Sequence, residues 1–544
     1  MLALVLVACH EQPGDLDGLP RPDDSSPPEI TDSDTDPPET GDDSDTTDSV
    51  PKDTGEIPLI TGKASVRSNP SNPFSAFVTV TLDLDATVQV AYGEAGNLDH
   101  TTPPVDVVAG VATDILVLGL HASRKMDLRV DATHGLAAWS SNPLAYTTAD
   151  LETGWPTCTP SFIVDEKEFD PDEVFCTQGT LANGSDIYYC VDHWGDPVFS
   201  MRTAASDSLM SMEPLMDGSW ASTSYNNSKV VFFDAAGATT KSLPVSAFAD
   251  ETRFEHQYVD SHEIYQIREG KWRGDVVFIT DSYETVGSDY KMGNGIVVID
   301  PVTYDVVYDY SFLGPLDDGV SNDPFLPFDR AGYGDYAQDW LHSNAVLHGI
   351  DPDGREYFLI SMKSQDWIVK LYPDTDELAW ALGFDGDFTL VDDLDAASPV
   401  ELDAYDWDFH QHGMRFLDNE GPRLDLVMLD NGYPRQDENG PNWNIVYSRF
   451  VELEIDQDSM RAAMPFTYGK RFGPDQMFSS TCGNALLLPD GQRMVGLMGE
   501  TDTIIEVSYP EGERRWWMQC ESMDWCAYQV HWFPDMYDTA WIYE

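Results

Sequence analysis

A histidine stands at the head of the same short pattern in three stretches of this chain. Each stretch runs from the histidine through an apolar strand and a glycine-bearing turn into a second apolar strand. The histidines are His262, His342 and His412, and a fourth copy carries Cys482 in their place. The successive intervals are 80, 70 and 70 residues. A near-regular series of strand pairs is typical of a β-propeller, in which each repeat is one radial sheet.

Two earlier stretches repeat the strand pairing without a leading histidine: DIYYCVDHWGDPVFSM and SLMSMEPLMDGSWASTSYNNSKVVFFDAAG. Counting them gives about six blades, and we assign the propeller to residues 151–544. If the first residues of each innermost strand point to the central channel, the histidines converge on one pocket. The sequence therefore predicts a six-bladed β-propeller with a candidate site at its hub.

Residues 58–150 have a different pattern, made of short alternating strands such as AFVTVTLDLD and TVQVAYG. Alternation with a period of two, bounded by turns, indicates a β-sandwich. The segment VLGLHASRKMDLRVDAT resembles a fibronectin type III strand pair, with Met126 where the aromatic residue usually stands. The predicted fold class is therefore all-β, with a fibronectin type III-like sandwich before the propeller.

The first nine residues, MLALVLVAC, are apolar and resemble the lipobox of a bacterial lipoprotein signal. The resemblance implies that Cys9 carries the lipid after cleavage. We expect an exported bacterial lipoprotein, anchored on the periplasmic face of the outer membrane or at the cell surface.

Residues 10–57 form an Asp/Thr/Pro-rich linker with 16 acidic residues against Arg21 and Lys52. Such a stretch buries too little apolar surface to offset its ordering entropy, and its like charges extend it. The whole chain has a formal net charge of −66. A field of this sign repels phosphates, so binding of DNA or RNA is not expected. It also disfavours anionic substrates, unless a site gathers positive charge locally.

Export permits disulfides. We expect Cys520 to pair with Cys526 across a short loop, and Cys158 with Cys176 as the next pair. Cys190 and Cys482 then remain, either paired or free. No Cys or His cluster has the spacing of a structural zinc site, so we predict neither a metal nor a cofactor.

Three segments carry a resemblance to a known family: DWLHSNAV with the following SMKSQDWIVKL, FHQHGMRFLDNEGPRLDLVMLDNGYPR, and YSRFVELEID. Over residues 155–544 the chain resembles the bacterial arylsulfate sulfotransferases, periplasmic six-bladed propellers that follow a small β-domain. The resemblance implies transfer of a sulfuryl group from an aryl sulfate donor to a phenolic acceptor. It also implies a covalent intermediate on a hub histidine.

The resemblance assigns roles residue by residue. His342 matches the histidine of the W-[FL]-H-x-N motif, His412 that of the Q-H motif, and Arg435 the arginine after D-N-G. Where the family has Arg-His-Gln, this chain has Lys363-Ser364-Gln365. The predicted catalytic and supporting residues are His342, His412, Lys363 and Arg435, with His262, His410, Asn344 and Asn431 as a secondary set.

By repeat position, the covalent histidine of the family would fall near Cys482, which makes this cysteine a candidate nucleophile. Three outcomes follow: another hub histidine, His342 or His412, takes the covalent role, transfer is direct, or the pocket binds without turnover. The main alternative function is an inactive propeller lipoprotein that binds a small aromatic or anionic ligand, or a protein partner. A second rival is a metalloenzyme with His262, His342 and His412 as ligands. Assembly into a homodimer is left open.

Overall fold

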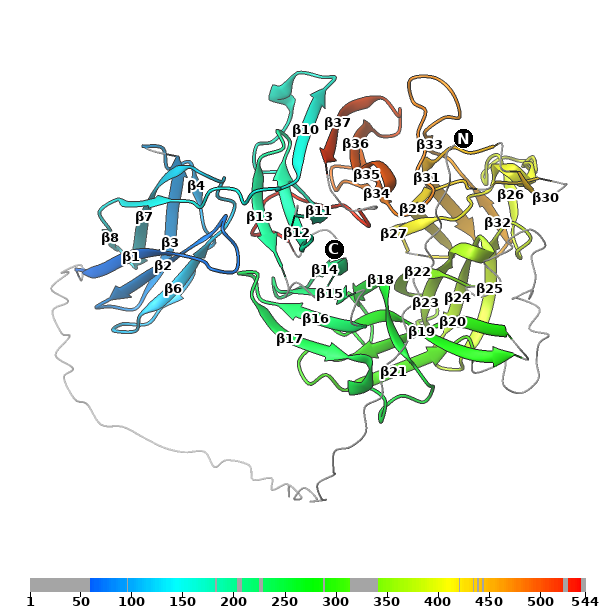
Figure 1. Ribbon diagram of the computed structural model, residues 1–544, viewed down its shortest axis with the longest axis horizontal. Helices are drawn as coiled ribbons and strands as arrows, with labels where there is room; N and C mark the ends of the chain where they lie inside the picture. The colour runs from blue at the N-terminus through cyan, green and yellow to red at the C-terminus, as the bar shows by residue number, and fades with distance from the viewer. Residues whose placement is uncertain are drawn as a thin grey trace, which may run out of the picture. The chain divides into compact units, whose positions relative to one another are not determined.

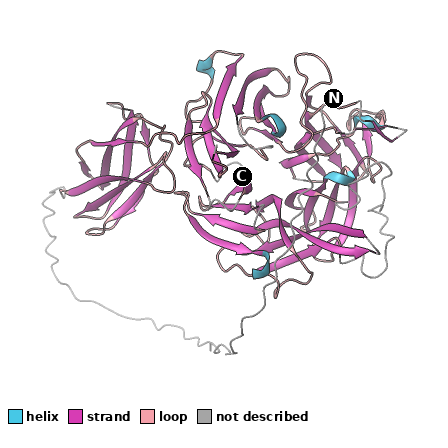
Figure 2. Cartoon of the chain, in the orientation of Figure 1, coloured by secondary structure: helices cyan, strands magenta, loops and turns pink. Residues whose placement is uncertain are grey.

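The computed structural model describes residues 59–94, 96–181, 183–202, 208–224, 228–286, 289–313, 341–419, 421–433, 435–437, 440–442, 445–521 and 527–539. The predicted signal segment with Cys9, the acidic linker and Cys526 lie outside these ranges. Within them the chain is built of β-strands with short 3₁₀ turns and no α-helix (Figure 2). Accordingly, none of the described segments is a helix able to cross a membrane.

The first part of the fold is a β-sandwich (Figure 1). In β2 every second residue is buried, including Ala76, Val78 and Val80. These side chains share one core with Val90 and Leu128 of the second sheet, so the alternation does bury one face of each sheet. One sheet contains β1 (Gly62–Ser68), β2 (Ala76–Leu82) and β6 (Thr113–Val117); the other contains β4 (His100–Thr101), β3 (Ala86–Glu94), β7 (Lys125–His134) and β8 (Ala137–Ser140), with β5 (Val105–Val107) on β3 and β9 (Leu144–Thr147) on β7. Its likeness to fibronectin type III stays a prediction.

Residues 157–533 form a propeller-type series of six sheets within the described ranges, antiparallel except where β26 joins. We number the sheets 1 to 6 in the order in which most of their strands occur along the chain. Sheet 1 holds β38 (His531–Phe533), β11 (Val174–Thr180), β12 (Asp186–Asp192) and β13 (Pro197–Met201); sheet 2 holds β14 (Leu209–Pro214), β15 (Trp220–Ser224), β16 (Lys229–Phe233) and β17 (Thr239–Pro244); sheet 3 holds β18 (Tyr258–Gln266), β19 (Val276–Val286), β20 (Asp289–Ile299) and β21 (Val306–Ser311).

The later sheets follow the same order. Sheet 4 holds β22 (Ser343–Ile350), β23 (Glu356–Met362), β24 (Trp367–Tyr372) and β25 (Glu377–Gly383); sheet 5 holds β27 (His412–Asp418), β28 (Arg423–Asp430), β31 (Arg449–Asp456), β32 (Arg461–Ala463), β26 (Thr389–Val391) and β33 (Thr467–Tyr468); sheet 6 holds β34 (Asn484–Leu487), β35 (Arg493–Met498), β36 (Thr503–Ser508), β37 (Arg514–Glu521) and β10 (Thr157–Phe162). A hairpin of β29 (Arg435–Asp437) and β30 (Gly440–Asn442) and the 3₁₀ turns η1 (Glu166–Glu168), η2 (Val245–Ala247), η5 (Lys363–Gln365), η6 (Ala404–Asp406) and η7 (Gly499–Thr501) complete the described elements.

The inner strands are buried on both faces. Every residue of β12 after Asp186 is buried, as is every residue of β23 after Glu356. Continuous apolar runs of this length are typical of strands covered on both sides, as blades stacked on their neighbours require. The all-β, propeller-type fold is confirmed, while the blade count stays a prediction.

Two strand pairings join the ends of the propeller. The early strand β10 pairs with β37 of sheet 6 (Figure 1), and the late strand β38 pairs with β11 of sheet 1. Both junctions bring together residues more than 300 positions apart. These pairings cover edges that would otherwise present unpaired backbone groups.

The cysteines reinforce this closure and correct the predicted pairing. Cys158 of β10 bridges Cys520 of β37, across a sequence separation of 362 residues. Cys176 bridges Cys190 of the neighbouring strand. The predicted Cys520–Cys526 and Cys158–Cys176 pairs are therefore wrong. A short interval in the sequence does not predict the cysteine pairs here, because each disulfide joins two hydrogen-bonded strands rather than the ends of one loop.

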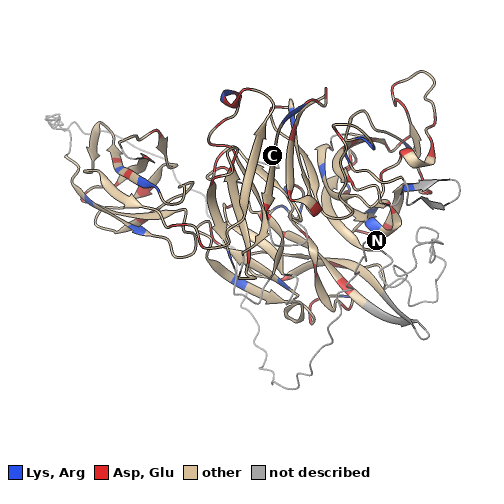
Figure 3. Ribbon diagram, turned by 45° about the horizontal axis from the view of Figure 1, so that its top comes forward, with Lys and Arg blue, Asp and Glu red and all other residues tan. Residues whose placement is uncertain are grey.

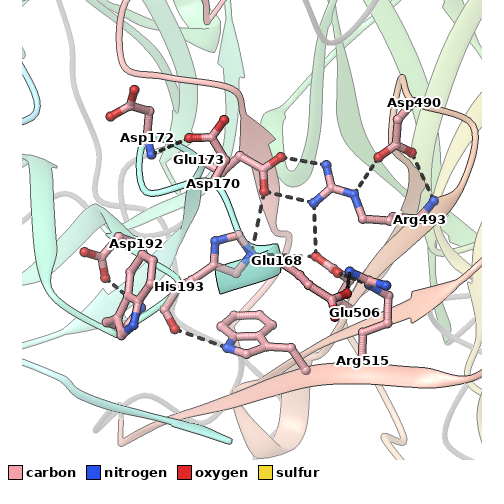
Figure 4. Close-up of polar contacts among 12 residues, drawn as sticks. Glu168, Asp170, Asp172, Glu173, Asp192, His193, Asp490, Arg493, Glu506 and Arg515 are labelled. Carbon is pink, nitrogen blue, oxygen red and sulfur yellow. Dashed lines mark hydrogen bonds and ion pairs between the residues drawn. The ribbon is translucent and has the colours of Figure 1, made fainter. Parts of the chain in front are cut away.

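Buried charges also connect sheets 1 and 6 (Figure 4). Arg493 donates two hydrogen bonds to Glu173, at 2.9 and 2.6 Å, and lies 3.6 Å from Glu506. Arg515 donates to Glu506 at 3.0 Å. Nε2 of His193 lies 3.6 Å from Glu173 and 3.7 Å from Glu506. Buried charges are tolerated when they are paired in this way. The junction is therefore held by ion pairs as well as by the disulfide.

Candidate active site

The inner ends of sheets 4, 5 and 6 share one backbone conformation. His342, His410 and Cys482 have φ values of 48°, 54° and 56°, in the left-handed region. The equivalence is confirmed by hydrogen bonds, because Ser364 N donates to Leu341 O and Gly432 N to Phe409 O. His410, rather than His412, is thus the repeat counterpart of His342.

This alignment of the sheets corrects the alignment of the repeats that was read from the sequence. His412 is the counterpart of Asn344 and Asn484, not of His342 and Cys482. Asn344 Nδ2 donates to Gln411 O at 2.7 Å, and Asn484 Nδ2 to Val530 O at 2.9 Å. Each of these amides therefore ties its sheet to the backbone of another. In sheet 5 the imidazole of His412 takes this position, and its hydrogen bonds are different.

The protonation of His412 follows from the amide of Asn431. Nδ2 of Asn431 donates to the carbonyl oxygens of Ser479, at 2.9 Å, and Cys482, at 3.1 Å. The other amide atom, Oδ1, therefore faces Nδ1 of His412, at 2.6 Å. An amide oxygen only accepts hydrogen bonds, so Nδ1 of His412 carries the proton. In the neutral ring Nε2 then holds the lone pair.

Nε2 of His412 is buried and makes no hydrogen bond to the described residues. Burial lowers the pKa of His412 well below its ordinary value, and the nearby Lys363 ammonium lowers it further. His262 and His342 add smaller effects of the same sign. The ring is therefore neutral at ordinary pH. A neutral imidazole with an unshared lone pair, enclosed among cations, is poised as a nucleophile.

His262 and His342 form a second part of the hub. Their Nε2 atoms lie 3.1 Å apart. Nδ1 of His262 donates to Asp260, at 2.6 Å, because a carboxylate can only accept. One proton must therefore lie between the two Nε2 atoms for the contact to be favourable. Burial raises the pKa of Asp260, but its contacts with His262 outweigh this and hold it below its usual value.

Lys363 reaches the hub from the turn η5, directly after β23. Its backbone N–H donates to the carbonyl of His342, at 3.1 Å, which fixes the turn against the inner end of sheet 4. The residue is only 6% exposed. Since Lys363 also influences His412, its ammonium supplies positive charge to the interior of a strongly acidic chain.

Tyr528 lies between the two histidine groups and was not anticipated from the sequence. Its ring centroid is 5.5 Å from that of His262 and 6.4 Å from that of His412. Its hydroxyl donates to Asn344 O at 2.6 Å. Tyr528 belongs to the segment that leads into β38, outside the repeats, so no periodic signal could have found it. Asp260 was also missed, although residues i and i+2 of a strand share a face.

A buried polar layer borders the histidines. Glu263 directly follows His262 in the sequence, and Gln529 directly follows Tyr528. Arg415 lies three residues after His412. Arg415 Nη1 donates to Glu263 at 3.2 Å, and Gln529 Nε2 donates to the same carboxylate at 3.3 and 3.2 Å. All three side chains are at most 5% exposed. This layer places buried polar side chains, joined by hydrogen bonds, next to the histidines.

Arg435 lies in a separate cluster. Its guanidinium is fully buried, donates to Asp430 at 2.6 Å and to Trp407 O at 3.0 Å, and lies 4.1 Å from the ring centroid of Tyr447. Asp430 directly precedes Asn431. Arg435 is thus placed to brace the strand end that carries Asn431; its contact with substrate stays a prediction.

His410 is engaged locally. Its backbone N–H donates to Asp366 at 2.9 Å, and its carbonyl accepts from Nδ1 of His412 at 3.0 Å. His410 thus supports His412 through its backbone.

Cys482 is itself disulfide-bonded, so it offers no thiolate. Its role at the hub is its carbonyl, which accepts from Asn431. The disulfide therefore excludes Cys482 as the nucleophile that the repeat suggested.

The hub histidines do not have metal-ligand spacing. Among the described residues, one group brings three ligand atoms within 4.8 Å of one another: His121, Asp192 and Asp196. His121 and Asp192 already form a hydrogen bond of 3.1 Å, which raises the pKa of His121. The metalloenzyme rival with His262, His342 and His412 is not supported by this geometry.

Comparison with known proteins fits this site. A family model described as arylsulfotransferase (ASST) matches residues 164–531. The chain belongs to the arylsulfotransferase family. The match covers both histidine groups, Lys363 and Tyr528, and confirms the resemblance read from the sequence. No curated protein matches the chain significantly.

Several solved structures resemble this arylsulfotransferase-family chain only distantly. A Bacteroides caccae protein of unknown function is 8% identical, with a TM-score of 0.38, over 66% of this chain and 98% of that one. Hydrazine synthase of Kuenenia stuttgartiensis is 9% identical, with a TM-score of 0.31, over 59% and 70%. A virginiamycin B lyase from Staphylococcus aureus is 10% identical, with a TM-score of 0.26, over 67% and 99%. These scores are too low to bear on function.

Proposed function

We propose that the protein transfers a sulfuryl group from an aryl sulfate ester to a phenolic acceptor, with His412 as the covalent nucleophile. One observation carries the proposal. In a chain of the arylsulfotransferase family, Nε2 of His412 is buried without a hydrogen-bond partner in the described structure, and Asn431 holds the proton on Nδ1. His342 suits the covalent role less well, since its Nε2 already faces His262.

In the first step Nε2 of His412 attacks the sulfur of the donor. The N–S bond forms as the bond from sulfur to the aryl oxygen breaks, and the electron pair of that bond leaves with the phenolate. The proton held between His262 and His342 passes to the phenolate oxygen. The sulfated ring of His412 keeps its Nδ1 proton and becomes cationic, which strengthens its hydrogen bond to Asn431.

In the second step the acceptor phenol occupies the place of the departed phenol. Its hydroxyl returns a proton to the His262–His342 pair, and its oxygen attacks sulfur. The S–N bond breaks, its electron pair returns to Nε2, and His412 is again neutral. The two half-reactions are mirror images, so one acid–base pair serves both.

The sulfuryl oxygens carry negative charge throughout the transfer. Lys363 supplies a cation beside His412. Preorganised donors in a water-excluded site stabilise a developing anion far more than the same groups do in water. Lys363 therefore takes the role that the family gives to an arginine at this position.

The same proposal includes an exported, lipid-anchored location. The disulfides Cys158–Cys520 and Cys176–Cys190 support it, because such bridges persist in oxidising compartments. Anchoring through Cys9 fits the lipobox. Labelling of the expressed protein with a radioactive fatty acid, compared with Cys9→Ser, would test the anchor directly.

The test of activity uses 4-nitrophenyl sulfate as donor and phenol as acceptor. The native chain is expected to release 4-nitrophenol and to form phenyl sulfate. Without acceptor, mass spectrometry of rapidly quenched peptides should find one sulfuryl group on the peptide that contains His412. His412→Ala should abolish both signals, whereas His134→Ala, on the exposed end of β7, should retain them.

Sulfation of a different residue would overturn the assignment of His412. Absence of release with every phenol offered would leave the inactive, ligand-binding propeller.

A further inference from the structure

Ser448 lies directly before β31, beside the amide that orients His412. The register of β28 and β31 pairs Asp430 with Arg449, so Asn431 and Ser448 are the next residues of the two strands beyond this pair. Arg449 Nε donates to Asp430 at 2.7 Å, which joins the strand ends through their side chains as well. Ser448 and Asn431 are both fully buried. A buried hydroxyl needs hydrogen-bond partners within the fold, so the partners of Ser448 show what it holds in place.

Ser448 binds the backbone on both sides of the hydrogen bond between Asn431 and Ser479. Its Oγ lies 2.9 Å from Asn431 O and 3.2 Å from Ser479 O, so its one proton is shared between two acceptors. The same oxygen accepts the N–H of Ser479 at 2.9 Å. The N–H of Ser448 donates to Met477 O at 2.9 Å. One residue thus joins the backbone of Asn431 to the segment that leads into sheet 6.

Ser479 in turn places the carbonyl groups that the Asn431 amide faces. Its Oγ donates to Thr481 O at 2.7 Å and accepts the N–H of Glu500 at 3.0 Å. The segment is thereby folded so that the carbonyls of Ser479 and Cys482 both accept from Asn431 Nδ2, at 2.9 and 3.1 Å. The two protons of an amide nitrogen suffice for two such acceptors.

These two carbonyls decide which way the Asn431 amide points. If the amide turned over, Oδ1 would face two carbonyl oxygens, which can only accept hydrogen bonds. Both would lose their donor, and a buried acceptor without a donor is costly. With the amide held as observed, Oδ1 accepts from Nδ1 of His412 at 2.6 Å, and the lone pair stays on Nε2. The tautomer of the nucleophile therefore depends on where the carbonyls of Ser479 and Cys482 are placed.

We propose that Ser448 is a positioning residue for sulfuryl transfer: its hydroxyl holds the Ser479 carbonyl against the Asn431 amide and so keeps the proton of His412 on Nδ1. This inference rests on the proposed function and extends the control of the nucleophile to a hydroxyl on another strand. Ser448 acts through Asn431, so it should matter only while the amide is present.

A double-mutant cycle on kcat tests this order of action. The variants are Ser448→Ala, Asn431→Ala and the two together, assayed with saturating 4-nitrophenyl sulfate and phenol. Ser448→Ala should lower kcat about 3- to 10-fold, the size that one net hydrogen bond represents. It should have no further effect once Asn431 is alanine. Ser222→Ala is the matched control and should keep the native kcat, because Ser222 is equally buried and its Oγ donates to a backbone carbonyl, that of Thr223, at 2.9 Å.

An unchanged kcat in Ser448→Ala would overturn the inference. Losses that multiply in the double variant would overturn it too, because they would mean that Ser448 supports the fold independently of Asn431.

NMR of the protein labelled with ¹⁵N-histidine reads the tautomer without turnover. In the native chain His412 should show a protonated, pyrrole-type Nδ1 and a pyridine-type Nε2, assigned by the loss of both signals in His412→Ala. In Ser448→Ala the two nitrogen shifts should move toward each other as the opposite tautomer becomes populated, whereas Ser222→Ala should keep the native shifts. Native shifts in Ser448→Ala would contradict the proposed control of the tautomer.

The two measurements keep this inference apart from the transfer activity. A native chain that transfers no sulfuryl group, but whose His412 shifts change in Ser448→Ala, would refute the function and keep the role of Ser448 in setting the tautomer. A native chain that transfers sulfuryl groups, with native kcat and native His412 shifts in Ser448→Ala, would refute the role of Ser448 and keep the function.

Discussion

Oδ1 of Asn431 lies 2.6 Å from Nδ1 of His412, and this contact selects the tautomer of the ring. The orientation of the amide is not arbitrary, since its Nδ2 donates to two backbone carbonyls. An ordinary histidine can place its proton on either nitrogen. Here the lone pair is directed to Nε2, the atom left without a partner. Asn431 is therefore a positioning residue, and its substitution should alter reactivity without removing the nucleophile.

Asn431→Ala should lower kcat for aryl sulfate transfer about 10- to 100-fold, the size found when partners that orient a metal-bound histidine are removed. Asn431→Asp replaces the amide oxygen by a carboxylate, which stabilises the imidazolium form of His412. The acid limb of its profile of kcat/KM against pH should therefore move to higher pH. Steady-state assays across pH check both results. An acid limb that stays in place in Asn431→Asp would contradict the assigned contact.

Lys363→Met should also move this acid limb to higher pH. Burial is the main reason that the pKa of His412 is low, and Lys363 is the next. Loss of the ammonium lets His412 accept a proton at a higher pH, and the neutral, nucleophilic form is then lost sooner as pH falls. Lys363→Arg keeps the charge and is the matched control, whose limb should remain in place. A shift to lower pH in Lys363→Met would contradict the electrostatic role.

Asp260→Asn should affect poor leaving groups more than good ones. The Asp260 carboxylate stabilises a charged His262, which shares a proton with His342. Without it the protonated form of the pair is less populated, so less of the enzyme can protonate the departing phenolate. We expect kcat/KM to fall about 100-fold for phenyl sulfate and much less for 4-nitrophenyl sulfate, whose leaving group needs little protonation. Equal losses for the two donors would argue against proton donation by this pair.

The all-β class and the hub location could be predicted from the sequence because strand pairs repeat along it. The residue-by-residue alignment of one repeat with the next could not be predicted. His410 and His412 are two residues apart, so both point the same way along a strand and either fits an interval of about 70 residues. The positive φ of His410 and the hydrogen bond from Gly432 N to Phe409 O show that His410 is the counterpart of His342.

The closure of the propeller by strands from its two ends could not be predicted from the sequence either. Cys158 and Cys520 meet because β10 joins the last sheet, and a local pattern carries no information about a strand 362 residues away. The sequence could place candidate histidines near one axis. It could not give the amide orientation of Asn431, the proton shared by His262 and His342, or the oxidised state of Cys482.

His531 should make the propeller sensitive to acid. Burial lowers the pKa of His531 to about 3, with a smaller contribution from Arg415, whereas an unfolded histidine titrates near 6.5. The unfolded chain therefore binds the extra proton first as pH falls. The stability from neutral His531 is complete above pH ~6.5 and declines toward pH ~3, by about 1.4 kcal/mol per pH unit.

The check compares guanidinium unfolding at pH 7 and pH 5, followed by tryptophan fluorescence. His531→Asn, which has no titrating group, should lose about 2 kcal/mol less stability than the native chain between these two values. His134→Asn, at an exposed position, should behave as the native chain. The same pH dependence in native and His531→Asn proteins would show that His531 does not carry this effect.

The charge of the chain should also select among acceptors through ionic strength. Acidic side chains are distributed over many strands and loops rather than gathered in one patch (Figure 3), and the net charge is −66. Such a field attracts cationic acceptors and repels anionic ones over a Debye length, about 30 Å at 0.01 M salt and about 3 Å at 1 M. As salt rises, kcat/KM should fall for tyramine, rise for 4-hydroxyphenylacetate and stay level for phenol. The three acceptors share one ring and one hydroxyl, so a common salt response would place the effect in the donor half-reaction or in the fold rather than in acceptor steering. Opposite slopes for the two charged acceptors would show that the surface field, and not the pocket alone, sets which phenols reach His412.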